Sequence, residues 1–282
     1  MTKLLRAGFA RLFKDKVFWI CSAVMAVYGI DISLDRYLSS VKFDMYHPAP
    51  DDIVFVVLAY GAIVYAIFTA LFVGREYSDG TIRNKFIVGH TRISVFLSTF
   101  IVAAVGNVII SLSYILPAAI IAIPAIGWFE HSEYIVGITF IALIILAVAY
   151  TAIYTVLALL NSNKAVNVVV CVVLSLALLI AGNALLSALH EPEFYSPAAV
   201  YEMDDNGDIV HADAPEVPNP YYISGVKRQV YQVIADILPG GQSAQLPFLQ
   251  SDHPDILALW SLAVIFVTNC IGILLFSRKD IK

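Results

Sequence analysis

The sequence predicts an all-α integral membrane protein, and three observations support this fold class. First, 60% of the 282 residues are hydrophobic and only 14% are charged, and mean hydropathy is +0.80. Soluble domains carry about 25% charged residues. Second, several uncharged apolar runs reach the roughly 20 residues with which a helix crosses a bilayer. Third, basic residues are unevenly distributed along the chain. These properties exclude a water-soluble enzyme and a disordered chain as first interpretations.

The N-terminal segment, residues 1–16, is predicted to form a short basic amphipathic helix. Leu5, Phe9, Leu12 and Phe13 fall near one helical face, whereas most Lys and Arg residues of the segment fall elsewhere. Helices of this kind lie in the headgroup layer of a membrane. We therefore expect an interfacial elbow helix that turns into the first span, with an unstructured positive segment as the alternative.

Six transmembrane helices are expected, five within residues 17–189 and the sixth at 256–276. The five long runs without Asp, Glu, Lys or Arg are Ile53–Val73, Ile93–Ile126, Tyr134–Leu160, Ala165–Leu189 and Ile256–Phe276. A shorter run, Val17–Ile30, is expected to extend towards Tyr37 and to be retained, since no signal-peptide cleavage site follows it. Pro117 and Pro124 are expected to break the third helix near its outer end, by a kink or by ending the span.

The distribution of Lys and Arg predicts that both termini are cytoplasmic. Six spans put the termini on one side, which receives 13 of the 17 Lys and Arg residues, including those of the tail 277–282. The other side receives 18 of the 22 Asp and Glu residues. Because basic residues accumulate in cytoplasmic loops, we expect a multi-pass protein of the plasma membrane, and the basic inner loops suit a bacterial one.

Residues 190–255 are expected to form a mostly irregular, acidic, extracellular cap over the outer mouth. The segment holds eleven acidic residues against Lys227 and Arg228. Apolar positions at helical spacing predict an amphipathic helix at Gly225–Leu238, and Tyr201–Pro220 is expected to be an irregular loop. The run MDDNGD at 203–208 resembles a calcium loop but lacks the downstream glutamate, so no metal site is expected there.

The loop 74–92, GREYSDGTIRNKFIVGHTR, contains a predicted short helix. Ser78 or Asp79 is expected to cap the start of Thr81–Val88, and Gly89 is expected to end it. Ile82, Phe86 and Ile87 share one face of this helix, which would dock on a partner or on the membrane surface. The helix is either a rigid lever between two spans or a solvated basic loop that only fixes topology.

Motifs for catalysis are missing from the sequence. It has no GxxxxGK[ST] phosphate loop, no GxSxG elbow and no HExxH motif, so no catalytic residues, metal ligands or resident cofactors are expected. The spans also lack ionisable residues, which argues against transport coupled to protons or sodium. Energy for transport would then come from a partner ATPase, and no nucleic acid partner is expected.

The loop and the topology together resemble the permease subunits of type-2 ABC transporters, especially the bacterial six-helix kind found in bacteriocin-immunity and multidrug exporters. In that family the second span is followed by E-x-x-x-G-T-x-[RK]-x-x-[LF] and a G-x-[ST]-R stretch. The matching positions here are Glu76, Gly80, Thr81, Arg83, Phe86, Gly89, Thr91 and Arg92. The basic N-terminal helix, the large outer segment and the ending FSRKDIK are similar too.

The resemblance implies that the loop is a coupling helix seated in a groove of a cytoplasmic ABC ATPase subunit, which binds ATP and Mg. Two permease copies and two ATPases would form the working unit. The implied ATPase-coupling residues are Glu76, Gly80, Thr81, Ile82, Arg83, Phe86 and Arg92, with Ile82 and Phe86 filling the groove. The second and fifth spans would form the dimer surface, with Tyr60, Tyr65, Asn167 and Asn183 as pathway candidates. Helix–helix packing is the alternative for each of these four.

The expected function is therefore that of a permease subunit in an ATP-driven exporter. The subunit is expected to be surrounded by membrane lipids, and the resemblance implies that it pairs as a homodimer. A neutral pathway suits an amphipathic or lipophilic substrate, such as an antimicrobial peptide, a drug or a lipid. Two rivals remain open. The chain could instead be a receptor or sensor subunit that binds a ligand outside and performs no transport, or a stand-alone facilitator that needs no ATPase.

Overall fold

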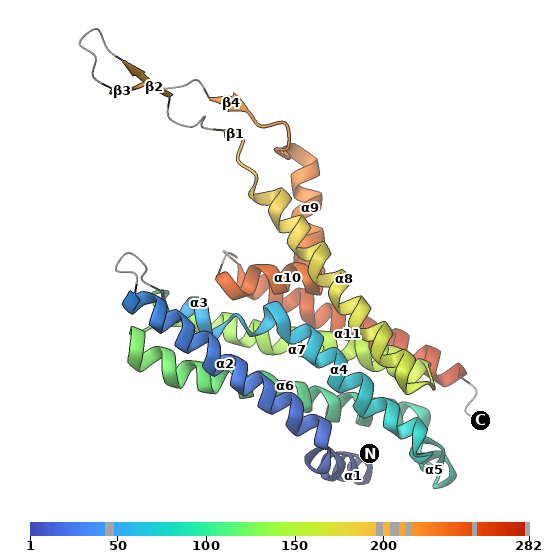
Figure 1. The fold of residues 1–282 in the computed structure, drawn as a ribbon. Helices are drawn as coiled ribbons and strands as arrows, with labels where there is room; N and C mark the ends of the chain where they lie inside the picture. Colours follow the sequence, from blue (N-terminus) through green and yellow to red (C-terminus); the bar gives the residue numbers. More distant parts are fainter. Residues whose placement is uncertain (43–47, 196–199, 204–208, 213–215, 250–252, 280–282) are drawn as a thin grey trace.

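The computed structural model describes residues 1–42, 48–195, 200–203, 209–212, 216–249 and 253–279. Long helices dominate this part of the chain (Figure 1). They are α2 (Lys16–Lys42), α4 (Val57–Ser78), α6 (Arg92–Ile126), α7 (Glu133–Leu160), α8 (Lys164–His190) and α11 (Pro254–Arg278). The shorter ones are α1 (Thr2–Lys14), α3 (Asp51–Val54), α5 (Thr81–Ile87), α9 (Gly225–Ile237), α10 (Pro239–Gln245) and the 3₁₀ turn Leu246–Phe248.

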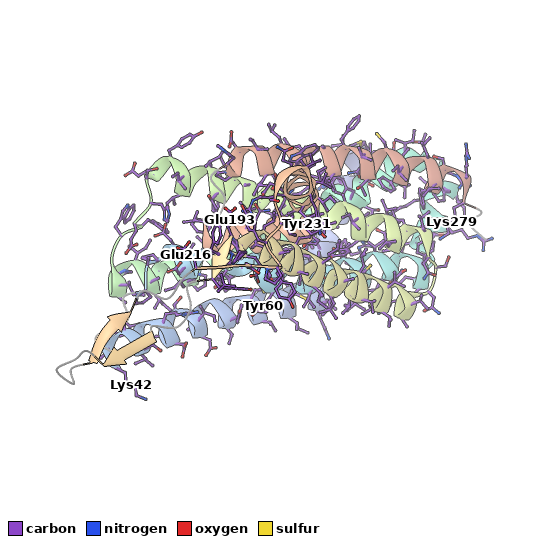
Figure 2. The ribbon with its side chains drawn as sticks, turned by 90° about the horizontal axis from the view of Figure 1, so that it is seen from above. Lys42, Tyr60, Glu193, Glu216, Tyr231 and Lys279 are labelled. Atoms are coloured by element: carbon purple, nitrogen blue, oxygen red, sulfur yellow. The ribbon has the colours of Figure 1, made fainter. Side chains whose placement is uncertain are left out.

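Five of the long helices are long and apolar enough to cross a membrane: α2, α6, α7, α8 and α11. The prediction of an all-α, multi-pass membrane protein is confirmed at this level. The helices lie lengthwise against one another, with α1, α5 and the last turns of α11 at one end of the bundle, here called the terminal end (Figure 1). Lys42 and Lys279 mark the opposite ends when the molecule is viewed from above (Figure 2).

Polar caps set the starts of three long helices close to the predicted positions. Thr91 Oγ1 accepts a hydrogen bond from the Ser94 amide at the start of α6, and Ser132 Oγ accepts one from Ile135 at the start of α7. Asn163 Oδ1 accepts from the first amides of α8. Such caps satisfy backbone donors that have no partner inside the helix. Tight connections at these points let consecutive helices run antiparallel.

The structure corrects two expectations about where the long helices begin and end. The helix α6 runs from Arg92 to Ile126 with Pro117 and Pro124 inside it, so neither proline ends it, and the predicted alternative of a kink stays a prediction. The region of the second span begins instead with the single turn α3, and α4 starts only at Val57. A proline removes one backbone donor, and in α6 the flanking turns pack well enough for the helix to continue.

The bundle interior combines apolar packing with a row of neutral polar contacts. Tyr65 OH lies 2.6 Å from Ser111 Oγ, and Asn107 Nδ2 donates to Thr69 at 2.9 Å and to Thr151 at 2.8 Å. These bonds join α4, α6 and α7. Inside a membrane protein, hydrogen bonds of this kind contribute to helix association because lipid offers no alternative partners.

The region between α8 and α11 differs from the predicted cap. The strands β1 (Phe194–Tyr195) and β4 (Val217–Pro218) pair, and β2 (Val200–Met203) pairs with β3 (Ile209–Ala212). Figure 1 shows these strands at the tip of an arm that the end of α8 and α9 carry away from the bundle. The prediction of an irregular loop at Tyr201–Pro220 is therefore wrong, and the strands do not cover the bundle as the predicted cap would. The predicted amphipathic helix is present as α9. The calcium-like run lies outside the described residues at 204–208.

The helix α10 is buried inside the bundle, although its sequence PGGQSAQ was assigned to the outer segment. Close approach of backbones places it there. A Cβ on Gly240 would lie 1.8 Å from the Leu178 carbonyl oxygen of α8, and one on Gly182 would lie 2.2 Å from the backbone of Gly240. Only glycine permits such contacts. Side chains complete the fit, because Gln242 Oε1 accepts from Ser261 Oγ of α11 at 2.6 Å.

Candidate functional site

The short helix α5 has well-defined ends. Gly80 precedes it with φ of +65°, a left-handed conformation that favours glycine. No side chain caps the start of the helix. The expected cap by Ser78 or Asp79 is therefore wrong. At the other end the predicted stop at Gly89 is confirmed: the Gly89 amide donates to Phe86 O and the His90 amide to Lys85 O. This pair of bonds is a Schellman motif, which terminates helices.

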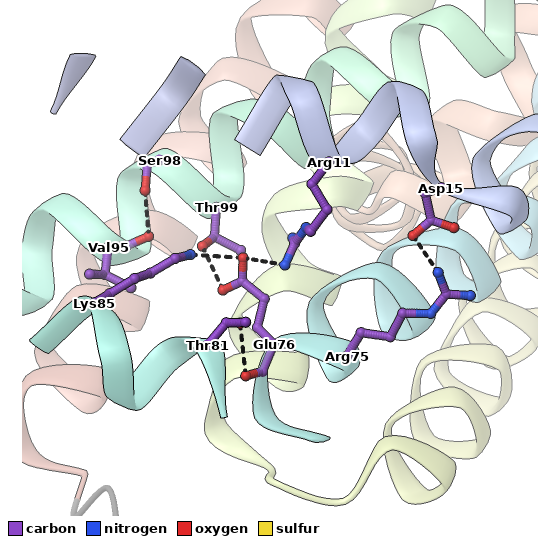
Figure 3. Close-up of polar contacts among 9 residues, drawn as sticks. All are labelled: Arg11, Asp15, Arg75, Glu76, Thr81, Lys85, Val95, Ser98 and Thr99. Carbon is purple, nitrogen blue, oxygen red and sulfur yellow. Dashed lines mark hydrogen bonds and ion pairs between the residues drawn. The ribbon is translucent and has the colours of Figure 1, made fainter. Parts of the chain in front are cut away.

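A buried carboxylate ties α5 to three other helices. Glu76, near the end of α4, is only 2% exposed. Its Oε1 accepts from Arg11 Nη1 of α1 at 2.7 Å and from Lys85 Nζ of α5 at 2.8 Å, and its Oε2 accepts from Thr99 Oγ1 of α6 at 3.4 Å. Figure 3 shows these side chains converging on Glu76. We call Glu76, Arg11, Lys85 and Thr99 the Glu76 cluster.

Additional contacts brace the Glu76 cluster. Thr81 Oγ1 donates to the backbone oxygen of Glu76 at 3.1 Å, which fixes the first residue of α5. The Arg11 guanidinium also lies 4.0 Å from the centre of the Phe72 ring, a cation–π contact. Since removing one partner of a buried charge leaves the rest poorly solvated, these elements are expected to hold one arrangement together.

A second ion pair lies beside the cluster and fixes the turn between α1 and α2. Arg75 Nη1 donates to Asp15 Oδ2 at 2.7 Å, and Asp15 Oδ1 accepts from the Val17 amide at 2.7 Å (Figure 3). The Asp15 side chain is buried, while Arg75 is partly exposed. The N-terminal helix α1 is thus attached to α4 by two carboxylates, Asp15 and Glu76.

The apolar side chains of α5 do not all face outward, which corrects one expectation. Ile82 is 1% exposed, and the Phe86 ring packs 6.3 Å from the ring of Phe276 in α11. Ile82 is therefore covered by the chain's own contacts, whereas Phe86 is partly buried. Arg83 and Asn84 are exposed, together with Ile87 at 74% and Val88 at 76%.

Two basic residues fasten the C-terminal end of α11 to the same region. Arg92 Nη1 donates to the Phe276 carbonyl at 3.1 Å and to the Lys279 carbonyl. Lys279 Nζ donates to Leu159 O and to Tyr77 OH, each at 2.9 Å, and Tyr77 OH donates to Leu159 O. Cations are favourable at helix C-termini, where carbonyls lack partners. Partial burial lowers the pKa of Lys279 below its usual value.

The structure brings together two of the four pathway candidates. Tyr60 and Asn183 both line a cavity of about 340 Å³ between α2, α4, α8 and α10, which Arg36 also lines. Tyr65 instead pairs with Ser111 in the interior. Asn167 donates to Ala158 O and Asn161 O at 3.2 Å each, which fixes the turn after α7. Packing roles therefore account for Tyr65 and Asn167.

Several functional contacts were not foreseen from the sequence. Glu76, Gly80, Thr81, Arg83 and Arg92 do lie at the terminal end as predicted, around α5. The partners Arg11, Asp15, Arg75 and Thr99 were missed because they come from α1, α4 and α6. One signal in the sequence could have indicated them. Asp15 and Glu76 are acidic, although they fall in segments predicted to lie on the membrane side that holds most Lys and Arg residues.

Comparison with known proteins adds no assignment. No protein-family model matches the chain, and a search of curated proteins finds no match. The arrangement of α5 on the Glu76 cluster is therefore the basis on which a function can be proposed.

Proposed function

We propose that the chain is the membrane-spanning permease subunit of an ATP-driven exporter of the type-2 ABC kind, and that α5 transmits force from a separate ATPase. One observation carries the proposal: buried Glu76 joins α5 to α1, α4 and α6 through Lys85, Arg11 and Thr99. A push on α5 therefore acts on α1 and on the long helices α4 and α6 at once. A loop that only fixed topology would not need a buried carboxylate with two cationic partners.

The proposal includes six spans, with α4 as the second. Residues 57–74 of α4 are free of Asp, Glu, Lys and Arg, and α4 lies among α6, α7 and α8. Its charged residues Arg75 and Glu76 fall in its last turns, next to α5. With α4 counted, the chain ends on the side where it begins. The helix α1 then serves as the elbow helix, with its exposed Phe13 near the membrane surface.

The ATPase would bind the exposed surface of α5, formed by Arg83, Asn84, Ile87 and Val88. Two aliphatic side chains beside a cation and an amide are a suitable contact for a groove in a soluble protein. This surface replaces the role first given to Ile82 and Phe86. ATP and Mg would bind to the partner, with both termini of the permease in the cytoplasm of a bacterial cell.

A second permease copy would pack against α8 rather than α4. Among the α4 side chains that the structure describes, only Tyr60 and Ser78 are exposed, whereas α8 presents Val169, Val173 and Ile180. The cavity lined by Tyr60 and Asn183 borders this face. It combines aromatic, amide and basic groups, which suits an amphipathic or lipophilic substrate.

The test is to purify the chain gently from its native membrane, identify co-purifying proteins and measure vanadate-sensitive ATP hydrolysis. We expect a stoichiometric ATPase. Arg83→Glu combined with Ile87→Asp should abolish its binding, because both changes lie on the exposed face of α5. Arg6→Glu is the matched control, since Arg6 is exposed at the same end but on α1. A folded chain that retains no ATPase, even after crosslinking through residue 87, would favour a sensor or a facilitator.

A further inference from the structure

The helix α9 is amphipathic, but its polar face lines a pocket and its apolar face is exposed. Arg228, Gln232 and Asp236 follow one another at four-residue spacing and so form a polar stripe along the helix. They all line a pocket against α8 and α11. On the opposite side, Val226, Val230, Val233 and Ile237 are exposed. A surface helix normally buries its apolar stripe, so the inward polar stripe calls for an explanation.

The pocket that this stripe lines has a volume of about 280 Å³, near the lower end of the range for small-molecule sites. Four elements build it, namely α8 and the three consecutive α-helices α9, α10 and α11. The aliphatic side chains of Leu186, Leu189, Ile256 and Leu257 form one part of its wall, and His190, Gln245 and His253 join the α9 stripe in the polar part. Gln245 is 3% exposed, so a buried polar group contributes to the wall.

The pocket is less acidic than the segment that surrounds it. Residues 190–255 contain eleven acidic residues, two strongly basic ones and three histidines. The pocket gathers one of the two basic residues, Arg228, and two of the three histidines, against a single carboxylate, Asp236. That carboxylate is already engaged, since Oδ1 accepts from Gln232 Nε2 at 2.9 Å and from Gln245 Nε2 at 3.4 Å. Donor groups therefore prevail at the Arg228 end.

We infer that this pocket binds a small acidic group, a phosphate or carboxylate carried by a solute or by a lipid headgroup. The Arg228 guanidinium supplies a planar pair of N–H donors that matches either oxyanion. The imidazole N–H of His190 adds a donor from α8. The aliphatic wall would contact the remainder of the ligand. This inference stands on α9 and the pocket alone and is independent of the proposed transport function.

The experiment uses the full chain in phosphatidylcholine nanodiscs, with inorganic phosphate exchanged for chloride at constant ionic strength. Binding should raise the thermal unfolding midpoint by about 5 °C when phosphate reaches 100 times its dissociation constant. A second arm replaces part of the phosphatidylcholine by phosphatidylglycerol without free phosphate. A shift in this arm alone assigns the ligand to a lipid headgroup, and a shift in the first arm assigns it to a free anion.

Two neighbouring residues provide a matched pair of variants. Arg228→Gln should abolish the shift in the unfolding midpoint. Lys227→Gln should keep this shift, because it removes the same charge from an exposed residue outside the pocket. Should Arg228→Gln not fold, His190→Gln should weaken binding about tenfold. The inference is overturned by the absence of a shift in both arms, or by equal losses in Lys227→Gln and Arg228→Gln.

Discussion

The terminal end and the outer arm use charged residues in opposite ways. At the terminal end, Glu76 and Asp15 are buried and each is paired with cations from other helices. At the outer arm, the charged residues Arg228 and Asp236 of α9 line a pocket instead, and beside it α8 meets α10 through a close backbone contact between Gly182 and Gly240. One end is held by buried ion pairs between helices, whereas the other places its charges at a pocket and is joined to the bundle by close backbone packing.

The largest expected effect comes from the glycine contact between α8 and α10. Gly240→Ala would place a methyl group 1.8 Å from the Leu178 carbonyl oxygen, so α10 could not remain seated on α8. We expect a loss of about 3–5 kcal/mol in the free energy of unfolding, measured by thermal unfolding in detergent. Gly137→Ala is the control, because a Cβ there meets open space. Equal stability of the two variants would show that the backbone contact does not hold α10 against α8.

A smaller effect is expected from the buried carboxylate of the Glu76 cluster. Glu76→Gln keeps the shape but removes the charge that Arg11 and Lys85 share, and both of these cations are partly exposed and can regain water. We expect a loss of about 2–3 kcal/mol. Asp79→Asn removes an exposed carboxylate only three residues after Glu76 and should be neutral by the same unfolding measurement. A neutral Glu76→Gln would remove the charge-based account of the terminal end.

The Asp15–Arg75 pair should show a weaker coupling than Glu76. Asp15 has a single cationic partner, whereas Glu76 has two. Arg75 is also a third exposed, so water screens its charge. A double-mutant cycle with Asp15→Asn and Arg75→Gln should give a coupling of about 1 kcal/mol. A coupling energy near that of the Glu76 ion pairs would mean that burial of the carboxylate alone decides how strongly a pair is coupled.

The smallest effect concerns pH and the Lys279 amine. Burial lowers the pKa of Lys279 in the folded chain below its value of 10.5 in the unfolded one. Between these two pKa values the unfolded chain binds more protons, so stability rises with pH across this window. The slope of unfolding free energy against pH should be less positive in Lys279→Gln than in the wild type. An identical slope in both proteins would contradict the assignment.

The same contrast explains how much of the fold the sequence could predict. Long uncharged runs predicted the long helices, and Gly89 predicted the end of α5, because both signals are local. The helix α10 was missed because PGGQSAQ has the composition of a loop, and its burial depends on glycines that let it approach α8. A local pattern does not report which distant backbone a segment will touch.

The candidate site was predictable only in its position along the chain. The spacing of Ile82 and Phe86 indicated an apolar face, but it could not tell whether a partner or Phe276 of the same chain would cover it. The pairing of Arg11 with Glu76 likewise joins residues from α1 and α4. Periodicity within one helix carries no information about such a partner.

The enclosed position of α10 has a consequence for biosynthesis. The ribosome delivers α8, α9 and α10 before α11, yet Gln242 of α10 donates to Asp236 O and accepts from Ser261 of α11. Until α11 has been synthesised, one of these bonds has no partner, and an unsatisfied buried amide is costly. Insertion of the last helix should therefore be the step that locks α10 in place, so that a nascent chain ending before residue 254 would carry this segment undocked.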